Sequence, residues 1–157
     1  MTARAIAALA AGIVALSGCG SEGSSTVSGG ADADAVGVIK AWADELRAGD
    51  VEAAAERFQI PVIVQNGTPP LRLTNRSEVV GFNKTLPCGA ELIRAEREGR
   101  FTVATFRLTE RPGPGRCGVG TDETARTAFV IHNDRITEWR RVADQPPGEQ
   151  APQGPVI

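Results

Sequence analysis

The chain has 157 residues, of which 41% are hydrophobic and 23% are charged, and its net charge is −2. This length suits one domain, and the composition argues against a disordered or membrane-spanning protein. The slight acidic excess predicts no nucleic acid partner, because nucleic-acid binders neutralise phosphates with a surplus of Lys and Arg. Tyr is absent and His occurs once, so groups for proton transfer or metal binding are few. We therefore predict no cofactor and no metal site.

Residues 1–18 have the organisation of an export signal. Arg4 supplies a positive charge, and an uncharged, Ala-rich run of twelve residues follows from Ala5 to Leu16. A membrane-spanning helix needs about 20 apolar residues, whereas the apolar region of a signal peptide has about 7–15. The run ends in Leu16-Ser17-Gly18-Cys19, which resembles the lipobox of bacterial lipoproteins. The resemblance implies cleavage before Cys19 and a diacylglyceryl thioether on its sulfur.

Two acyl chains anchor a protein stably to a bilayer. We therefore expect the protein to lie on the extracytoplasmic face of the cell membrane. The membrane is its expected partner, and the lipid on Cys19 is the anchor. The Gly/Ser-rich residues 19–32 have the composition of a flexible tether. The folded domain is predicted over 33–142, and the Pro/Gln-rich residues 143–157 read as a disordered tail.

Helical periodicity opens the domain from Ala35 to Ala48. Gly49 suits the residue that ends a helix, and Asp50 then caps a short second helix, Val51 to Phe58. Pro61 is expected to end this helical run. The apolar face of the first helix, with Trp42 at its edge, is formed by residues at helical spacing: Val36, Ile39, Ala43 and Leu46.

A hairpin and a third helix come next. Val62–Val64 and Leu71–Leu73 flank Asn66-Gly67, which predicts two strands joined by a loop longer than two residues. The capping-box spacing of Asn75 and Glu78 then starts a helix, and Pro87 stops it. Its buried stripe is predicted to be Val79, Phe82 and Leu86.

Two long hairpins complete the domain. The first joins Leu92–Arg97 to Phe101–Leu108 by a tight turn at Gly99. One apolar and one mostly polar face suit a single antiparallel sheet packed on helices. The apolar face is predicted to carry Ile93, Ala95, Ala104, Phe106 and Leu108.

The second hairpin pairs Thr124–Ile131 with Ile136–Val142 around Asn133-Asp134. In the expected register Phe129 lies opposite Glu138 and Thr127 lies opposite Arg140, while Trp139 points to the other, more exposed face. If the Glu138 face lines the interior, its ion pair could orient a ligand; if it faces outward, both are surface residues. The candidate pocket residues are Trp42, Phe106, Thr127, Phe129, Glu138 and Arg140.

Cys88 and Cys117 remain once Cys19 is lipidated. An even pair in an exported domain predicts a disulfide. A zinc site is disfavoured, because there is no CxxC, His132 is remote and four ligands are needed. A catalytic thiol is disfavoured, since an exported thiol beside a second cysteine oxidises. Extending the strand pairing backwards sets Cys88 near Arg111, so the bridge would attach the Pro/Gly-rich loop to the end of the third helix.

The order helix, short helix, hairpin, helix and long antiparallel strands resembles the nuclear transport factor 2-like cone, which includes SnoaL-like cyclases and ketosteroid isomerases. The segments Val38–Ala53 and Phe129–Ile136 carry the likeness, which covers residues 33–142. The resemblance implies an α+β fold in which a cone-shaped, curved antiparallel sheet packs on N-terminal helices. It also implies a pocket in the mouth of the cone and frequent dimers through the sheet.

Catalytic members of this family use Asp, His and Tyr in the pocket. Here Tyr is absent, His132 lies beside a predicted turn, and Asp122 and Glu123 fall in a Gly-rich loop. We therefore predict no catalytic residues. Our first hypothesis is a non-catalytic, membrane-anchored domain that binds a small apolar ligand or a protein partner. The alternatives are a SnoaL-like isomerase or hydrolyase-type enzyme and a structural module that forms homodimers.

Overall fold

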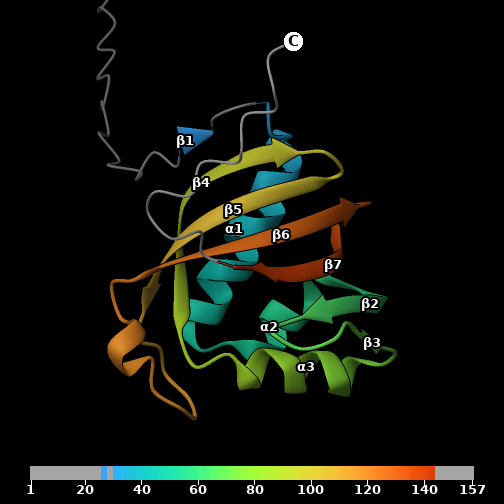
Figure 1. Cartoon of the computed structure of the whole chain (residues 1–157). Coiled ribbons are helices and arrows are strands. Elements are labelled where there is room, and N and C mark those ends of the chain that lie inside the picture. The colour runs from blue at the N-terminus through green and yellow to red at the C-terminus, as the bar shows by residue number, and fades with distance from the viewer. Residues whose placement is uncertain (1–25, 28–29, 144–157) are drawn as a thin grey trace, which may run out of the picture.

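A computed structural model of the chain describes residues 26–27 and 30–143 (Figure 1). The leader, Cys19 and all but the first residue of the tail predicted over 143–157 lie outside the described residues. The elements in chain order are β1 (Thr26–Val27), α1 (Ala33–Ala48), α2 (Val51–Glu56), β2 (Phe58–Gln65), β3 (Leu71–Leu73), α3 (Arg76–Thr85), β4 (Gly89–Glu98), β5 (Phe101–Thr109), a 3₁₀ turn (Gly118–Gly120), β6 (Thr124–His132) and β7 (Arg135–Val142).

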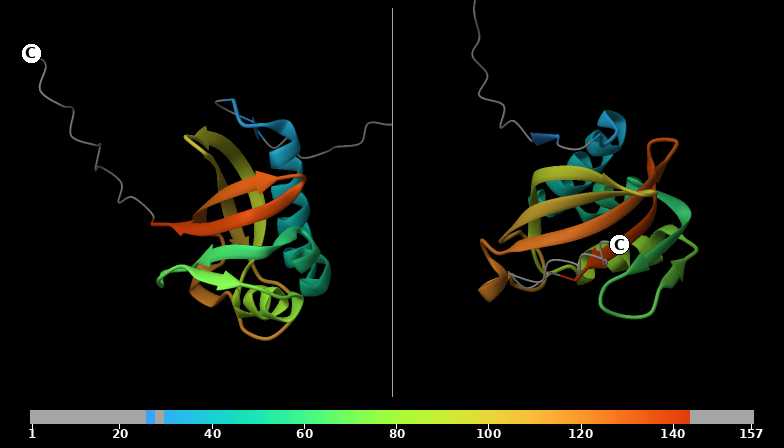
Figure 2. Two further views of the ribbon diagram at one scale, coloured as in Figure 1. Left: turned by 90° about the vertical axis from the view of Figure 1, so that its right-hand side faces the viewer. Right: turned by 45° about the horizontal axis from the view of Figure 1, so that its top comes forward.

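These strands form one sheet in the order β1-β4-β5-β6-β7-β2-β3. Figures 1 and 2 show the sheet curving around α1, with α2 and α3 at the end where β2 and β3 lie. The predicted α+β fold with a curved sheet on helices is confirmed. The sheet is mixed rather than wholly antiparallel, because β2 runs parallel to β7 and β1 runs parallel to β4. Since β1 falls inside the predicted tether, part of that segment forms a strand.

Local capping explains where the helices begin and end. Asp32 caps α1 by accepting a hydrogen bond from the Asp34 backbone N–H at 3.0 Å. Gly49 ends α1 with φ of 82°, and a Cβ there would lie 2.9 Å from the Pro112 carbonyl oxygen. Glycine is therefore required by both backbone conformation and space. The predicted buried stripe of α1 is confirmed.

The second helix is shorter than predicted. It ends at Glu56, and Phe58 instead begins β2, where it pairs with Ile136 of β7. The Ile136 N–H donates to the Arg57 carbonyl oxygen at 2.8 Å, so tertiary strand pairing overrides the local helical pattern. Pro61 lies inside β2, at the register shift against β7, where its missing N–H is tolerated.

A bulge in β4 changes the predicted register of the first long hairpin. The predicted pairing holds from Ala95 opposite Ala104 to the turn, but the register shifts between Leu92 and Arg94. The extra residue turns Ile93 outward, where 41% of it is exposed, and Leu92 takes its place in the core.

A second bulge inverts the predicted faces of β7. Ile131 lies opposite Ile136 as predicted, but the register shifts between Val130 and Ile131, so that Phe129 faces Trp139. A shift of one residue moves every later side chain to the other face. Trp139 is therefore buried, with 3% of it exposed, and the prediction that it lies on the exposed face is wrong.

Aromatic rings from separate elements meet in the core. The Trp42 ring makes edge contacts with Phe58, Phe106, Phe129 and Trp139, at centroid distances of 5.5–6.5 Å. Phe82 of α3 joins through Trp139 at 5.1 Å. The aromatic residues assigned to the interior from the sequence therefore share one core, which Phe58 and Trp139 complete: Trp42, Phe82, Phe106 and Phe129.

Candidate functional site

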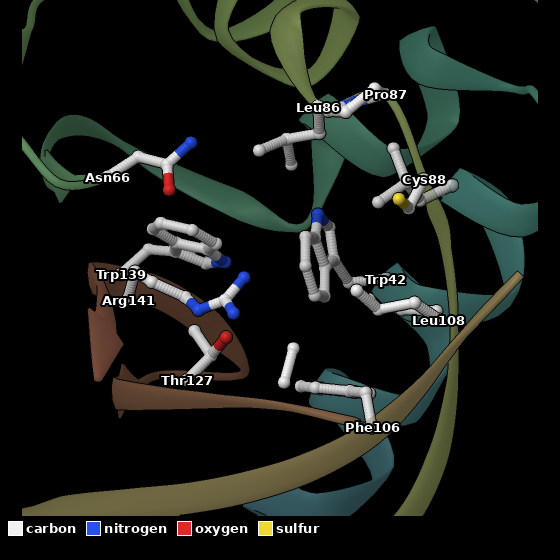
Figure 3. Close-up of a pocket in the computed structure, with 13 residues that line it drawn as sticks. Trp42, Asn66, Leu86, Pro87, Cys88, Phe106, Leu108, Thr127, Trp139 and Arg141 are labelled. Carbon is white, nitrogen blue, oxygen red and sulfur yellow. The ribbon is translucent and has the colours of Figure 1, made fainter. Parts of the chain in front are cut away.

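An apolar cavity of about 120 Å³ lies between α1 and the inner face of β5, β6 and β7 (Figure 3). The loop after α3, the start of β4 and the residue that follows β2 complete its lining. Apolar side chains, two indoles, an amide, a hydroxyl and a guanidinium line it: Trp42, Leu46, Asn66, Leu86, Pro87, Cys88, Ala90, Phe106, Leu108, Ala125, Thr127, Trp139 and Arg141.

One side of the cavity, which we call the apolar wall, consists of Trp42, Leu86, Pro87, Cys88, Phe106 and Leu108 (Figure 3). Its tryptophan is fixed by the protein itself. The Trp42 indole N–H donates to Asn83 Oδ1 at 2.9 Å, and Asn83 Nδ2 donates to the Val79 carbonyl oxygen at 2.9 Å. Asn83 is fully buried, so this bond joins α1 to α3 inside the core.

A buried arginine supports the apolar wall from behind. Arg111 donates to the Leu86 carbonyl oxygen from Nε at 3.0 Å and from Nη2 at 2.6 Å, and to the Asn83 carbonyl oxygen at 3.3 Å. It thereby satisfies carbonyl groups at the end of α3. Burial lowers the pKa of Arg111. No sequence pattern indicated this role, because the acceptors are backbone groups some 25 residues away.

The predicted disulfide is present in the same region. Cys88 and Cys117 are bonded, with their Cα atoms 4.5 Å apart, and Cys88 also lines the cavity. The bridge attaches the Pro/Gly-rich loop after β5 to the segment that follows α3, as predicted. The Glu110 carboxylate accepts hydrogen bonds from the backbone N–H groups of Gly118 and Cys117, which lower the pKa of Glu110.

The opposite side, which we call the polar wall, consists of Asn66, Thr127, Trp139 and Arg141 (Figure 3). The Trp139 indole N–H has no hydrogen-bond partner in the described part of the chain, and less than 1 Å² of its nitrogen is exposed. In Figure 3 this nitrogen points toward the space between Trp42 and Arg141, and the Arg141 guanidinium lies beside it. Two donors therefore converge at this end of the cavity.

Comparisons with known proteins establish the fold. No family model and no curated protein matches the chain. Similar solved structures include an NTF2-like protein from Cytophaga hutchinsonii, with a TM-score of 0.54 and 10% identity over 70% of this chain and 89% of that one. A candidate ketosteroid isomerase from Kribbella flavida has a TM-score of 0.51 and 17% identity, over 79% and 90%. The chain has a nuclear transport factor 2-like fold.

A candidate polyketide cyclase from Sinorhizobium meliloti also shares this nuclear transport factor 2-like fold, with a TM-score of 0.50 and 17% identity over 68% of this chain and 94% of that one. At such identities the likeness concerns the arrangement of the backbone. The chemistry of the site must come from the side chains of this chain.

The nuclear transport factor 2-like fold brings together only part of the predicted pocket. Trp42, Phe106 and Thr127 line the cavity, and Phe129 lies fully buried against the first two rings. Sequence reasoning missed the polar wall residues Trp139 and Arg141. The missing signal is the β6–β7 bulge, which no residue pattern on these strands marked.

Glu138 and Arg140 lie on the opposite face of the sheet, contrary to the interpretation that placed them with Phe129. They form the predicted ion pair through Arg140 Nε, and Arg100 Nη2 also contacts Glu138 Oε2 at 2.6 Å. Arg140 Nη1 donates to Gln65 Oε1 at 2.9 Å. These polar groups satisfy one another away from the cavity. The β6–β7 bulge is the reason, since it shifts β7 by one residue.

Proposed function

We propose that this domain binds a small apolar molecule in the cavity between α1 and the sheet. The observation that carries the proposal is an apolar space of about 120 Å³ beneath two indole rings. A cavity of about 150 Å³ lined by apolar side chains can hold benzene, whereas pockets for drug-sized ligands have about 300–1,000 Å³. The buried part of the ligand is therefore one ring or a short branched chain.

The lining favours binding over proton transfer. Its polar groups are two indoles, a hydroxyl, an amide and a guanidinium, which orient a ligand but are poor general bases. An isomerase or cyclase would need a carboxylate or imidazole within hydrogen-bond reach of its substrate. Glu138, the buried carboxylate of β7, faces away from the cavity and is held by two arginines.

Titration of toluene into the full chain tests the proposal. We expect a raised melting temperature and chemical-shift changes at the indole N–H signals of Trp42 and Trp139. Ala125→Leu should fill the cavity and abolish both effects. Ala128→Leu is the matched control, because Ala128 is also buried on β6 but lies on its other face, opposite Arg140.

Failure of toluene to bind the wild-type chain would overturn the proposal, as would equal binding by Ala125→Leu. The indole signals of the wild-type chain decide the question even if Ala125→Leu fails to fold. Shifts confined to residues outside the cavity would also count against it.

The leader supports a second part of the proposal, that the domain acts while anchored to the outside of the cell membrane by lipid on Cys19. No helix in the described ranges is long and apolar enough to cross a membrane. Wild-type chain should partition into the detergent phase after membrane extraction, and Cys19→Ala should leave an unacylated precursor that does not. Unchanged partitioning of Cys19→Ala would reject the anchor without affecting the cavity.

A further inference from the structure

We infer that the ligand is a monocarboxylate, whose carboxylate is bound by the Trp139 indole N–H and the Arg141 guanidinium at the polar wall. The inference rests on the proposed binding function and adds the chemical class of the ligand. It is carried by an unpartnered buried donor, a neighbouring cation and the size of the cavity.

The Trp139 N–H is a buried donor that has no acceptor among the described residues. Trp139 is 97% buried, and the indole makes an edge contact with Phe82 at 5.1 Å that fixes its orientation. A buried donor without an acceptor is unfavourable, so such groups are rare in folded proteins. The fold satisfies the other indole, Trp42, only 6.3 Å away. The unpaired Trp139 donor, directed into the cavity, indicates that the acceptor comes from the ligand.

The guanidinium of Arg141 favours a negatively charged acceptor. It follows Trp139 by two residues on β7, so both side chains lie on the inner face, and it pairs with Thr127 across the β6–β7 ladder. A cation and an N–H side by side create a positive potential that favours an anionic oxygen over a neutral one. A carboxylate has two oxygens, so one can accept from the indole while the other accepts from the guanidinium.

The cavity sets the rest of the molecule. The apolar wall faces the polar wall across a space of about 120 Å³, so the hydrocarbon must extend from the carboxylate toward Trp42 and Phe106. A single ring or a short branched chain fills this space. Benzoate has both features and is the probe of choice, with toluene and benzyl alcohol as uncharged analogues of similar shape.

Calorimetric titration of the full chain compares the three probes. One charge-assisted hydrogen bond changes affinity by about 10-fold to 100-fold. We expect benzoate to bind at least about 10-fold more tightly than toluene or benzyl alcohol. Trp139→Phe and Arg141→Gln should each remove most of this preference, so that each variant binds benzoate and toluene with affinities that differ by no more than about threefold. Arg140→Gln is the matched control on the other face of β7 and should change neither affinity.

The outcomes separate this inference from the proposed function. Equal binding of benzoate and toluene overturns the carboxylate while leaving an apolar site. Binding of neither probe overturns the proposed function itself. Tight benzoate binding that survives both polar-wall variants places the anion elsewhere and also overturns the inference.

A direct signal keeps the test decisive if a variant does not fold. In the wild-type chain, the indole N–H resonance of Trp139 should move downfield with benzoate but not with toluene, because only benzoate accepts its hydrogen bond. Absence of that difference rejects the contact.

Discussion

The two walls of the cavity contain one tryptophan each, and the two indoles differ in their hydrogen bonding. Trp42 in the apolar wall donates its N–H to the buried Asn83, whereas the N–H of Trp139 in the polar wall has no acceptor in the described residues. The rings are only 6.3 Å apart, so they share one environment. The difference shows that burial alone does not reveal the role of a side chain. Hydrogen bonding assigns Trp42 to structure and leaves Trp139 available for a ligand.

The largest expected effect lies in the apolar wall. Phe106 is fully enclosed and packs against Trp42 at 6.0 Å and Phe129 at 6.1 Å. Phe106→Ala should lower the free energy of unfolding by about 3–5 kcal/mol, through lost burial and the enlarged cavity. Chemical denaturation measures this loss, with Phe82→Ala as a comparison because Phe82 is only half-buried beside Trp139. A loss at Phe106 no greater than that at Phe82 would contradict the structural role of the apolar wall.

The disulfide behind the apolar wall gives the next largest effect. The Cys88–Cys117 bridge closes a loop with a sequence separation of 29 residues. In the loop-entropy model, its removal by the double change Cys88→Ser and Cys117→Ser should cost about 3–4 kcal/mol of stability. Thermal melts of the wild-type chain with and without reductant provide an independent measurement. If neither the reductant nor the substitutions change the melting temperature, the bridge does not contribute to the stability of the domain.

The same substitution at the two tryptophans isolates the hydrogen bond. Trp42→Phe and Trp139→Phe remove identical atoms from neighbouring positions, but only the first leaves a buried acceptor, Asn83 Oδ1, without its donor. An unsatisfied buried group costs about 1–3 kcal/mol, so Trp42→Phe should be more destabilising than Trp139→Phe by about that amount. Urea denaturation of both variants measures the difference. Equal losses would mean that Trp139 also donates a structural hydrogen bond.

Much of the apolar wall could be predicted from sequence, because the signals are local. The apolar spacing around Trp42 and the caps at Asp50 and Asn75 depend on residues a few positions apart. The disulfide followed from counting cysteines in an exported chain. These features are encoded by short segments whose geometry varies little between proteins.

The β7 residues of the polar wall, Trp139 and Arg141, could not be predicted, because their position depends on one bulge. Because of the register shift between Val130 and Ile131, the inner face of β7 carries Trp139 instead of Glu138. The position of a bulge depends on how the curved sheet packs on its helices. The residue pattern of the two paired strands does not contain this information. Phe58 was misplaced for a similar reason, since its pairing partner Ile136 lies far along the chain.

The smallest expected effect concerns Thr127, where the polar wall meets β6. Valine has nearly the same shape as threonine, so Thr127→Val removes the hydroxyl with little change in packing. If this hydroxyl serves the ligand rather than the fold, stability should change by less than about 1 kcal/mol, while benzoate affinity falls and toluene affinity does not. Thr105→Val is the matched control, because Thr105 is also buried but lies on the outer face of the neighbouring strand β5. Thermal melts and titrations of both variants measure these effects. A loss of about 2 kcal/mol or more at Thr127 alone would assign its hydroxyl to the internal hydrogen bonding of the fold. The contrast between the two walls would then reduce to the single donor of Trp139.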